Sequence, residues 1–377
     1  MKKIPFNAPS IVGDELDYIA DAIERGQLSG DGYYTKLCNK LIEGQTGSAK
    51  ALLTHSCTAA LEMAAILCDL SPGDEVIMPS FTFVSTANAV ALRGAVPVFV
   101  DIDPETLNIS PEAAEAAITA RTKAIFAVHY AGVPAEMDAL NDLAKSHDLI
   151  VVEDAAQALG STYNGRPCGS LGAMAAFSFH ETKNLISGEG GALTLNDARF
   201  FERAEIIREK GTNRSNFLRG HVDKYTWVDI GSSFLPGELV AAFLYGQLEN
   251  TERVNARRLN AFDAYNAAFS DLEQKERLRR PVIPQHCKAN GHMFYLLLRD
   301  IDDRDGFIAH MRSAGIATPF HYIPLHSSPG GLKLSRTDAT LDVTTNTSDR
   351  LVRLPIYYGI GDQTDQIIEH ARTYLIN

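Results

Sequence analysis

Short runs of apolar residues alternate with helical patterns from about residue 45 to residue 250. A run of roughly four to eight apolar residues between turn residues is typical of a buried strand, whereas apolar residues three and four positions apart indicate an amphipathic helix. Strand, helix and strand in repeated succession predict a parallel sheet that is covered by helices. The predicted strands are 51–53, 75–78, 96–100, 124–130, 149–153, 175–179 and 191–195, and the predicted helices between them include 59–68, 111–118 and 136–147.

The last third of the chain departs from this alternation. A helical pattern runs from residue 238 to about residue 269 and is followed by Pro281 and Pro284, which interrupt regular structure. This pattern predicts a long connecting helix and then a smaller α+β domain. We therefore expect an α/β fold with a mostly parallel sheet between helices. The predicted division is a large domain over 1–250, which begins with an N-terminal arm of about 1–30, and a small C-terminal domain over 251–377.

Composition and charge restrict the class of protein. Hydrophobic residues make up 45% of the 377 residues, which is enough for a sizeable core. The net charge of −12 disfavours a nucleic-acid partner, because phosphate contacts need a basic surface. No apolar run reaches the ~18 residues of a membrane span, and residues 1–30 contain no apolar signal segment. The five cysteines are scattered and form no C-x-x-C pair, which favours reduced thiols over disulfides or a metal site. We expect a cytoplasmic protein without a metal and without membrane insertion.

The segment F-S-F-H-E-T-K-N-L-I-S-G-E-G-G, residues 177–191, contains the strongest candidate for chemistry. It places Lys183 between an apolar run and a glycine turn, where an ammonium loses hydration and shifts toward the neutral amine that forms Schiff bases. The predicted strand 149–153 leads into Asp154. A carboxylate at a strand end, followed by a lysine loop, indicates a pyridoxal phosphate (PLP) site, in which the acid keeps the pyridine nitrogen protonated. Either residue alone is more simply a solvated lysine or a helix N-cap, but the pair favours catalysis.

Residues that suit the phosphate and ring of such a cofactor follow other predicted strands. Cys57 and Thr58 open a helix, where backbone N–H groups and a hydroxyl form an anion site. Ser178 is a further candidate for the phosphate, and Phe83 for one face of the ring. The structural alternatives are an N-cap for Thr58, an ordinary strand serine and a core aromatic. Neither G-x-x-x-x-G-K-[ST] nor G-x-G-x-x-G occurs, which disfavours an ATPase or a dinucleotide-binding enzyme.

Six motifs together point to one family. They are S-C-T-A-A-L from Ser56, P-S-F-T-F-V-S-T from Pro79, V-E-D-A-A-Q from Val152, S-F-H-E-T-K-N from Ser178, G-E-G-G from Gly188 and H-Y-I-P-L-H from His321. Essentially end to end, the chain resembles the nucleotide-sugar aminotransferases of the DegT/DnrJ/EryC1/StrS family, which are fold-type I PLP enzymes. The resemblance implies a Schiff base on Lys183, pairing of Asp154 with the pyridinium nitrogen, Gln157 near the phenolic oxygen, Phe83 on the ring, and Cys57, Thr58 and Ser178 at the phosphate.

The same resemblance implies the substrates and the assembly. The expected amino donor is L-glutamate, the expected acceptor is a dTDP-linked 4-keto-6-deoxy sugar, and the expected assembly is a homodimer with shared active sites. Relatives commonly read G-Y-N-Y-R where this chain has G-S-S-F-L at 231–235, and their asparagine reaches the partner's phosphate. Ser233 stands at that position with a shorter side chain, so this contact stays open. Many relatives also have glycine where this chain has Cys57.

Candidate residues for binding the nucleotide sugar lie in three parts of the chain. Residues 208–224 contain five cations, Lys210 and Arg214 among them, against two acids, which suits a pyrophosphate but equally a solvated loop. His129 follows a predicted strand, and Tyr322 and His326 lie in H-Y-I-P-L-H, although a single histidine is more often structural.

Two other functions remain open. A PLP-dependent sugar dehydratase is disfavoured because such relatives replace the lysine with histidine, and a non-enzymatic PLP-binding regulator would bind the cofactor without a half-reaction.

Overall fold

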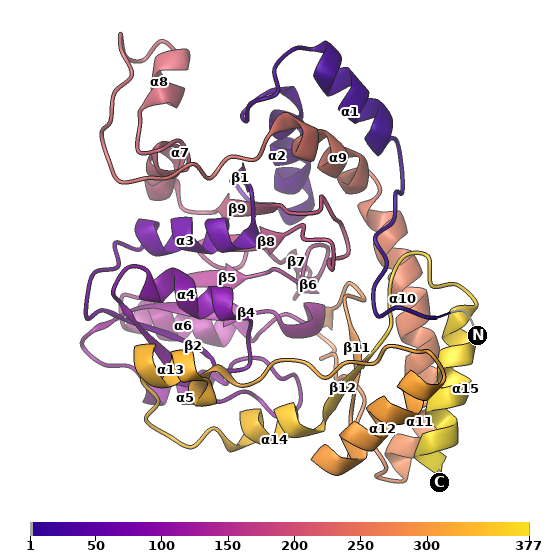
Figure 1. Ribbon diagram of the computed structural model, residues 1–377. Coiled ribbons are helices and arrows are strands. Elements are labelled where there is room, and N and C mark those ends of the chain that lie inside the picture. Colours follow the sequence, from indigo (N-terminus) through magenta and orange to yellow (C-terminus); the bar gives the residue numbers. More distant parts are fainter. Residues whose placement is uncertain (1–2, 377) are drawn as a thin grey trace.

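The computed structural model describes residues 3–376, so the ends of the predicted arm and of the predicted small domain lie outside the described residues. Within this range the large sheet has seven strands in the order β1-β9-β8-β5-β4-β2-β3 (Figure 1). Neighbours from β3 to β8 are parallel, whereas β9 is antiparallel to both β8 and β1. The predicted α/β class with a mostly parallel sheet is confirmed. The strands are β1 (Lys50–Thr54), β2 (Glu75–Pro79), β3 (Val96–Val100), β4 (Thr122–Val128), β5 (Ile150–Asp154), β8 (Met174–Ser178) and β9 (Gly191–Leu195).

Helices cover both faces of this sheet, and alternate strand residues supply the two cores. On β2, for example, Ile77 packs into one core, whereas Val76 and Met78 pack into the other. Because side chains alternate across a strand, a sheet that is buried on both faces needs apolar residues at nearly every strand position. The Met78 core contains α3 (Cys57–Leu67), α4 (Val84–Ala91) and α7 (Phe201–Arg208), and the Ile77 core contains α1 (Glu15–Glu24), α2 (Tyr33–Thr46), α5 (Pro111–Ala116), α6 (Met137–Ser146) and α9 (Glu238–Leu248).

Short elements connect these layers. Three two-residue strands pair beside the large sheet, and a short helix follows α7 in the segment that links it to α9. These elements are β6 (Thr162–Tyr163), β7 (Arg166–Pro167), β10 (Cys287–Lys288), the 3₁₀ turns η1 (Tyr130–Gly132) and η2 (Ala198–Phe200), and α8 (Arg214–Leu218).

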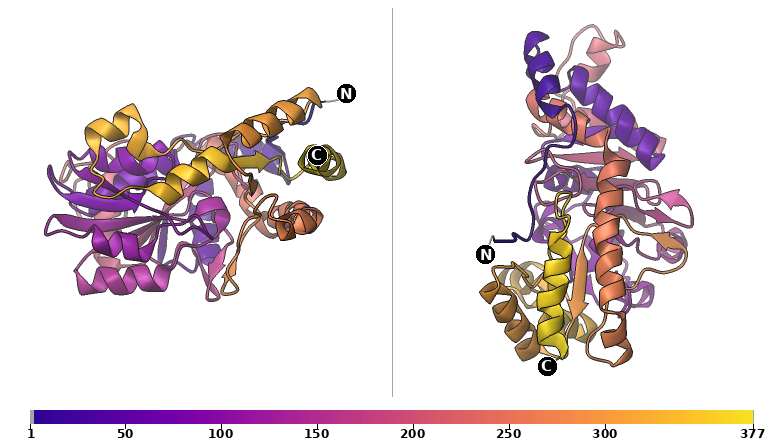
Figure 2. Two further views of the ribbon diagram at one scale, coloured as in Figure 1. Left: turned by 90° about the horizontal axis from the view of Figure 1, so that it is seen from below. Right: turned by 90° about the vertical axis from the view of Figure 1, so that its right-hand side faces the viewer.

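The C-terminal part has its own core around the antiparallel pair β11 (Phe294–Leu297) and β12 (Leu351–Leu354). In this core α10 and α15 pack side by side, and the views in Figures 1 and 2 agree on this arrangement. The N-terminal arm joins it, because Ile4 pairs with Ile316 and is buried there. The helices of this part are α10 (Thr251–Ala268), α11 (Ser270–Gln274), α12 (Ile301–Ser313), η3 (Leu325–Ser327), α13 (Pro329–Leu334), α14 (Asp342–Arg350) and α15 (Gln363–Ile376).

The helix expected over 238–269 is two helices, α9 and α10. At the junction the Asn250 side chain donates to the Gly246 carbonyl at 2.8 Å, and the Thr251 hydroxyl donates to the Leu248 carbonyl at 2.7 Å. These side-chain bonds satisfy carbonyls that a continuous helix would bond through its backbone, so they end the first helix. Since Val254 of α10 packs into the large-sheet core and Phe262 into the C-terminal core, the boundary at residue 250 stays a prediction. Between residues 3 and 376 none of the helices has the length and apolar character needed to cross a bilayer.

Candidate functional site

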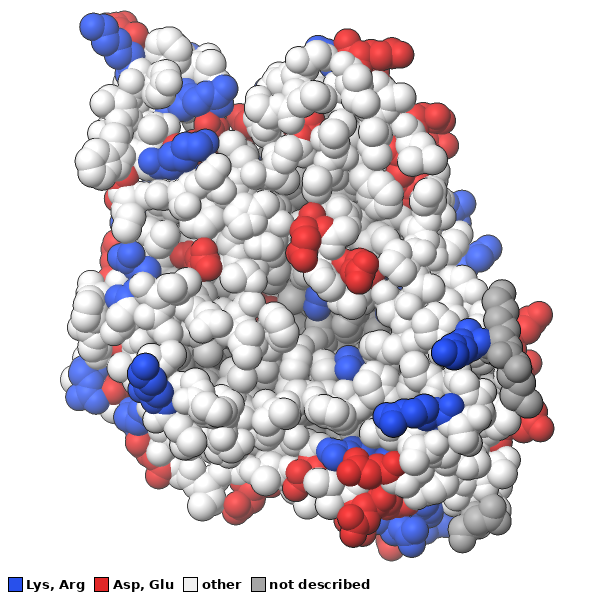
Figure 3. Space-filling view, in the orientation of Figure 1, with Lys and Arg blue, Asp and Glu red and all other residues white. Residues whose placement is uncertain are grey.

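A cavity of about 620 Å³ opens where three parallel strands end. Val128, Asp154 and Ser178, the last residues of β4, β5 and β8, contribute to its lining. The start of α3 forms one side, and residues of the C-terminal part, including His321 and Tyr322, form the other. Figure 3 shows a hollow in this face with Lys or Arg side chains inside it and mostly uncharged surface around it. The carboxyl edge of a parallel sheet is where α/β proteins bind ligands, so this cavity is the candidate active site.

Lys183 projects into the cavity from the loop between β8 and β9. Its backbone N–H donates to the His180 carbonyl at 2.9 Å, and the next side chain, Asn184, donates to Asn255 Oδ1 at 2.8 Å and to the Asn290 carbonyl at 3.0 Å. These bonds hold the loop against the C-terminal part. Desolvation lowers the pKa of Lys183, and the charge of Arg353 lowers it further, while Cys57 and Asp154 act in the opposite direction. The amine is therefore a better nucleophile near neutral pH than a solvated lysine.

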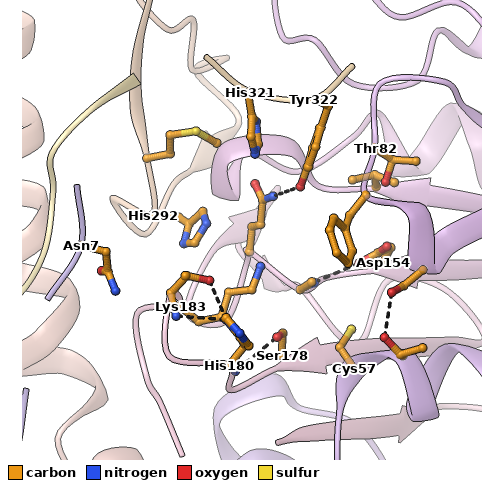
Figure 4. A pocket seen from close by; sticks show the side chains of 18 of the residues that line it. Asn7, Cys57, Thr82, Asp154, Ser178, His180, Lys183, His292, His321 and Tyr322 are labelled. Carbon is orange, nitrogen blue, oxygen red and sulfur yellow. Dashed lines mark hydrogen bonds between the residues drawn. The ribbon is translucent and has the colours of Figure 1, made fainter. Parts of the chain in front are cut away.

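Asp154 faces the same cavity and is held by a hydroxyl that the sequence analysis did not identify. Thr86 Oγ1 donates to Asp154 Oδ2 at 2.7 Å, and Thr82 Oγ1 lies 2.9 Å from Thr86 Oγ1. All three side chains are buried. Thr82 lies two residues before α4 and Thr86 lies in the first turn of this helix, so the start of α4 supplies the hydroxyl that orients the carboxylate. In Figure 4 Lys183 lies between Asp154 and His292.

The start of α3 forms a cradle that suits a phosphate group. Ser56 caps the helix by accepting from the Ala59 N–H at 3.1 Å, and Cys57 and Thr58 occupy the first turn. The Thr58 hydroxyl lies 2.7 Å from the hydroxyl of Ser85, another residue missed from sequence. Gly191 must be glycine, because a Cβ there would collide with the backbone of Ser56 and Cys57. The backbone N–H groups at the start of α3 and the hydroxyls nearby are donors of the kind that phosphate accepts from.

Four other predicted residues line the cavity with Lys183. Gln157 is fixed at both ends of its amide, since Oε1 accepts from the Ala131 N–H at 2.7 Å and Nε2 donates to the Tyr322 hydroxyl at 3.0 Å. Tyr322 stacks on His321 with ring centroids 3.6 Å apart. Phe83 remains 57% exposed, so its ring is free to cover a planar ligand. Ser178 lines the cavity as well, and its hydroxyl accepts from the His180 N–H at 3.4 Å.

The structure does not bring His129 or His326 to the cavity, which corrects their predicted placement. The His129 ring is fully buried, with Nε2 2.9 Å from Glu153 Oε2, while Nδ1 accepts from the Ala135 N–H at 3.1 Å. Glu153 and Asp154 are neighbours on one strand, so their side chains point to opposite faces, and His129 lies on the face of Glu153. His326 Nδ1 lies 2.7 Å from Ser80 Oγ, and this contact ties the H-Y-I-P-L-H segment to the end of β2.

Lys210, Arg214 and Ser233 also lie outside the part of the cavity that the described residues of this chain form. Arg214 Nη1 donates to Glu209 Oε2 at 3.0 Å, and two other cations of segment 208–224 pair with acids outside it: Arg208 with Asp31 and Arg219 with Glu205. The excess of cations in the linear segment is thus partly neutralised by tertiary contacts. Lys210 and Ser233 are exposed.

Comparison with known proteins agrees with this geometry. The model of the DegT/DnrJ/EryC1/StrS aminotransferase family matches residues 9–372. The chain is 37% identical over 333 residues to the uncharacterised protein MJ1066 of Methanocaldococcus jannaschii, covering 86% of this chain and 84% of that protein. It is 34% identical over 384 residues to the spore coat polysaccharide biosynthesis protein SpsC of Bacillus subtilis, covering 98% and 96%. The PLP-form of the putative sugar aminotransferase Spr1654 from Streptococcus pneumoniae superimposes with a TM-score of 0.91 at 26% identity, covering 100% and 99%.

The fold and the cavity define a fold-type I, PLP-dependent aminotransferase. Within that class, the chain belongs to the DegT/DnrJ/EryC1/StrS aminotransferase family of sugar aminotransferases. The residues fit the cofactor: the cradle at α3 suits its phosphate, Asp154 its ring nitrogen and Lys183 its aldehyde. When bound, PLP stores the amino group between the two half-reactions and withdraws electrons from the carbon that loses a proton.

Proposed function

We propose that this enzyme transfers the amino group of L-glutamate to C4 of dTDP-4-dehydro-6-deoxy-D-glucose, giving dTDP-4-amino-4,6-dideoxy-D-galactose and 2-oxoglutarate. The main support for amino transfer is that Lys183, whose pKa is lowered, lies in one cavity with Asp154. The choice of sugar rests on resemblance to the dTDP-4-amino-4,6-dideoxygalactose transaminase of enterobacterial common antigen synthesis. That resemblance lies in I-P-F-N-A-P from Ile4, S-F-H-E-T-K-N from Ser178, R-E-K-G-T-N-R-S from Arg208 and D-K-Y-T-W-V-D-I-G-S-S from Asp223. A cytoplasmic location is part of the proposal.

The side chains of the cavity have distinct proposed roles. As a neutral amine, Lys183 accepts the proton that leaves Cα of the donor. The same nitrogen then donates a proton in the step that follows, so one group performs both proton transfers. The carboxylate of Asp154, oriented by Thr86, pairs with the protonated ring nitrogen. Gln157 and Phe83 position the ring, and Cys57, Thr58 and Ser178 bind the phosphate. Tyr322 faces the space that remains for the sugar.

We further propose that two copies form the active enzyme. In support, apolar side chains of α1 and of the cavity mouth are exposed, among them Leu16, Ile23 and Phe83. The segment 208–224 and Ser233, which do not reach the cavity of their own chain, would then be available to the site of the partner subunit. In this arrangement Lys210 and Arg214 contact the pyrophosphate of the sugar nucleotide, and Ser233 approaches the cofactor phosphate.

The test is an assay with glutamate and a panel of dTDP- and UDP-linked 4-keto-6-deoxy sugars, with the configuration of the product at C4 read by NMR. We expect the dTDP-linked gluco-configured ketone to react fastest and to give the galacto product. A gluco product, or preference for a UDP sugar, would assign the enzyme to another aminotransferase of the family. Loss of a sugar hydroxyl without amino transfer would identify a dehydratase. Cofactor binding without release of 2-oxoglutarate from glutamate would identify a regulator.

A further inference from the structure

His292 lines the cavity beside Lys183, on the side of the lysine that is away from Asp154 (Figure 4). Its ring has no part in the roles proposed for the other side chains. The backbone of this residue is fixed at both of its polar groups. The His292 N–H donates to Asn290 Oδ1 at 3.0 Å, and Arg258 Nη2 donates to the His292 carbonyl at 2.6 Å. These two bonds hold the ring at a defined position in the cavity wall.

The tautomer of the His292 ring follows from its contact with Asn184, the residue after Lys183. Nδ1 of the ring lies 2.9 Å from Asn184 Oδ1. The nitrogen of the same amide donates to the Asn290 carbonyl at 3.0 Å and to Asn255 Oδ1 at 2.8 Å. Because a carbonyl can only accept, this nitrogen must face Asn290, and Oδ1 is left to accept from the histidine. Nδ1 therefore carries the ring proton, and Nε2 carries a lone pair.

Nε2 of His292 is an acceptor without a donor. Desolvation lowers the pKa of His292 well below its usual range, and the charges of Lys183, Arg258 and Arg353 lower it further, so the ring stays neutral at pH 7. Nε2 has no hydrogen-bond partner among the described residues, whereas Nδ1 has one. The Lys183 amine also bonds to none of residues 3–376, although it lies in the same cavity. A free acceptor and a free donor thus line one cavity as neighbours.

An acceptor at this position suits a lysine that moves a proton. A neutral primary amine has two N–H donors and one lone pair. If Nε2 of His292 accepts one N–H, the lone pair of Lys183 stays free to take the proton from Cα of glutamate, and the electron pair of the broken C–H bond stays with that carbon. The other tautomer would donate to the lone pair and block it. After the transfer Lys183 is an ammonium, and the same acceptor stabilises it, because hydrogen bonds from charged groups are stronger.

We infer that His292 is a positioning residue, which accepts a hydrogen bond from the Lys183 amine once that amine is released and so directs its lone pair to Cα of glutamate. Asn184 acts one step behind it, since its amide keeps Nε2 unprotonated. This inference rests on the proposed function, in which Lys183 carries the proton. The competing use of Nε2 is to accept from a hydroxyl group of the sugar. That use would leave the glutamate half-reaction unaffected.

The first measurement is the titration of Lys183 in the apoenzyme, by competitive acetylation with acetic anhydride across the pH range and mass spectrometry of the Lys183 peptide. Without the acceptor the ammonium is less stable, so His292→Phe should lower the midpoint by about one pH unit or more. His292→Gln, whose amide oxygen can replace Nε2, should recover at least half of this change. His147→Phe, which replaces an exposed histidine outside the cavity, should titrate as the wild type does. The other side chains that act on the Lys183 pKa are the same in all variants: Cys57, Asp154 and Arg353.

The second measurement follows turnover of the PLP-loaded enzyme. We expect His292→Phe to lower kcat about tenfold or more, to leave both KM values within about twofold, and to raise the isotope effect with glutamate deuterated at Cα. His292→Gln should lie between this variant and the wild type.

An unchanged Lys183 titration in folded His292→Phe apoenzyme would overturn the inference. Equal effects of the phenylalanine and glutamine replacements would do the same, and so would a change confined to the nucleotide-sugar KM. If the wild type releases no 2-oxoglutarate from glutamate, the proposed function fails, but the titration of the apoenzyme still decides whether His292 bonds the Lys183 amine.

Discussion

Two residues of the cavity, Lys183 and Asp154, are far apart in sequence but were paired by sequence reasoning because each follows a strand. The structure places both in one cavity and adds Thr86, whose hydroxyl bonds the carboxylate. No sequence signal distinguishes Thr86 from the other hydroxyl residues of P-S-F-T-F-V-S-T, because its role depends on where α4 lies relative to β5.

At the residue scale, Lys183→Ala should abolish transamination. The substitution removes both the nucleophile and the proton carrier, so we expect turnover to fall by at least about a thousandfold. The fold should persist, since the amine makes no hydrogen bond within the described residues that supports the cavity. The measurement is glutamate-dependent release of 2-oxoglutarate, with circular dichroism as the check on folding. Substantial turnover in the folded variant would contradict the assignment.

Thr86→Val tests the orientation of Asp154. Valine has nearly the shape of threonine but cannot donate, so the carboxylate loses a bond of about 1.5–3 kcal/mol. We expect cofactor affinity to weaken by roughly tenfold or more, as measured by fluorescence titration of the apoenzyme with PLP. Thr86→Ser is the matched control, because it keeps the hydroxyl and should stay within about threefold of the wild type. Equal affinities for the valine and serine variants would mean that the hydroxyl does not position Asp154.

At the scale of elements, the pattern of apolar residues located the strands well, because a sheet that is buried on both faces leaves a clear apolar run for each strand. It was less successful where side chains interrupt a helix. The break between α9 and α10 depends on bonds made by Asn250 and Thr251, and neither residue is a strong helix breaker in sequence. Likewise, β4 ends at Val128 rather than at Tyr130, since η1 begins there.

The segment that contains α8 carries the next prediction. If Lys210 and Arg214 reach the nucleotide sugar of the partner subunit, Lys210→Ala and Arg214→Ala should each raise its KM about tenfold and leave the glutamate half-reaction nearly unchanged. Arg219→Ala is the internal comparison, since Arg219 already pairs with Glu205 and should affect the nucleotide-sugar KM least. Steady-state kinetics with both substrates provide the measurement. If both half-reactions slow together, the segment supports the fold instead.

For the molecule as a whole, the prediction concerns its assembly. The exposed apolar side chains of Leu16 and Ile23 on α1, and of Phe83 at the cavity, favour a second copy as the partner. We expect a single species of twice the chain mass in sedimentation velocity at micromolar concentration. Leu16→Glu should weaken the dimer and lower activity together. A fully active monomer would show that each chain completes its own site.

The sequence by itself determined the α/β class, the family and the central pair Lys183 and Asp154, because these depend on local patterns and on motifs of consecutive residues. Tertiary structure decided which other side chains reach the cavity. His129 was a candidate because it follows a strand, but strand alternation turns it toward Glu153. Arg353 has no motif of its own, yet packing over Phe6 and the absence of an acid partner among the described residues leave it facing the cavity. Contacts between distant segments set burial and charge balance, and neither quantity can be read from neighbours in the chain.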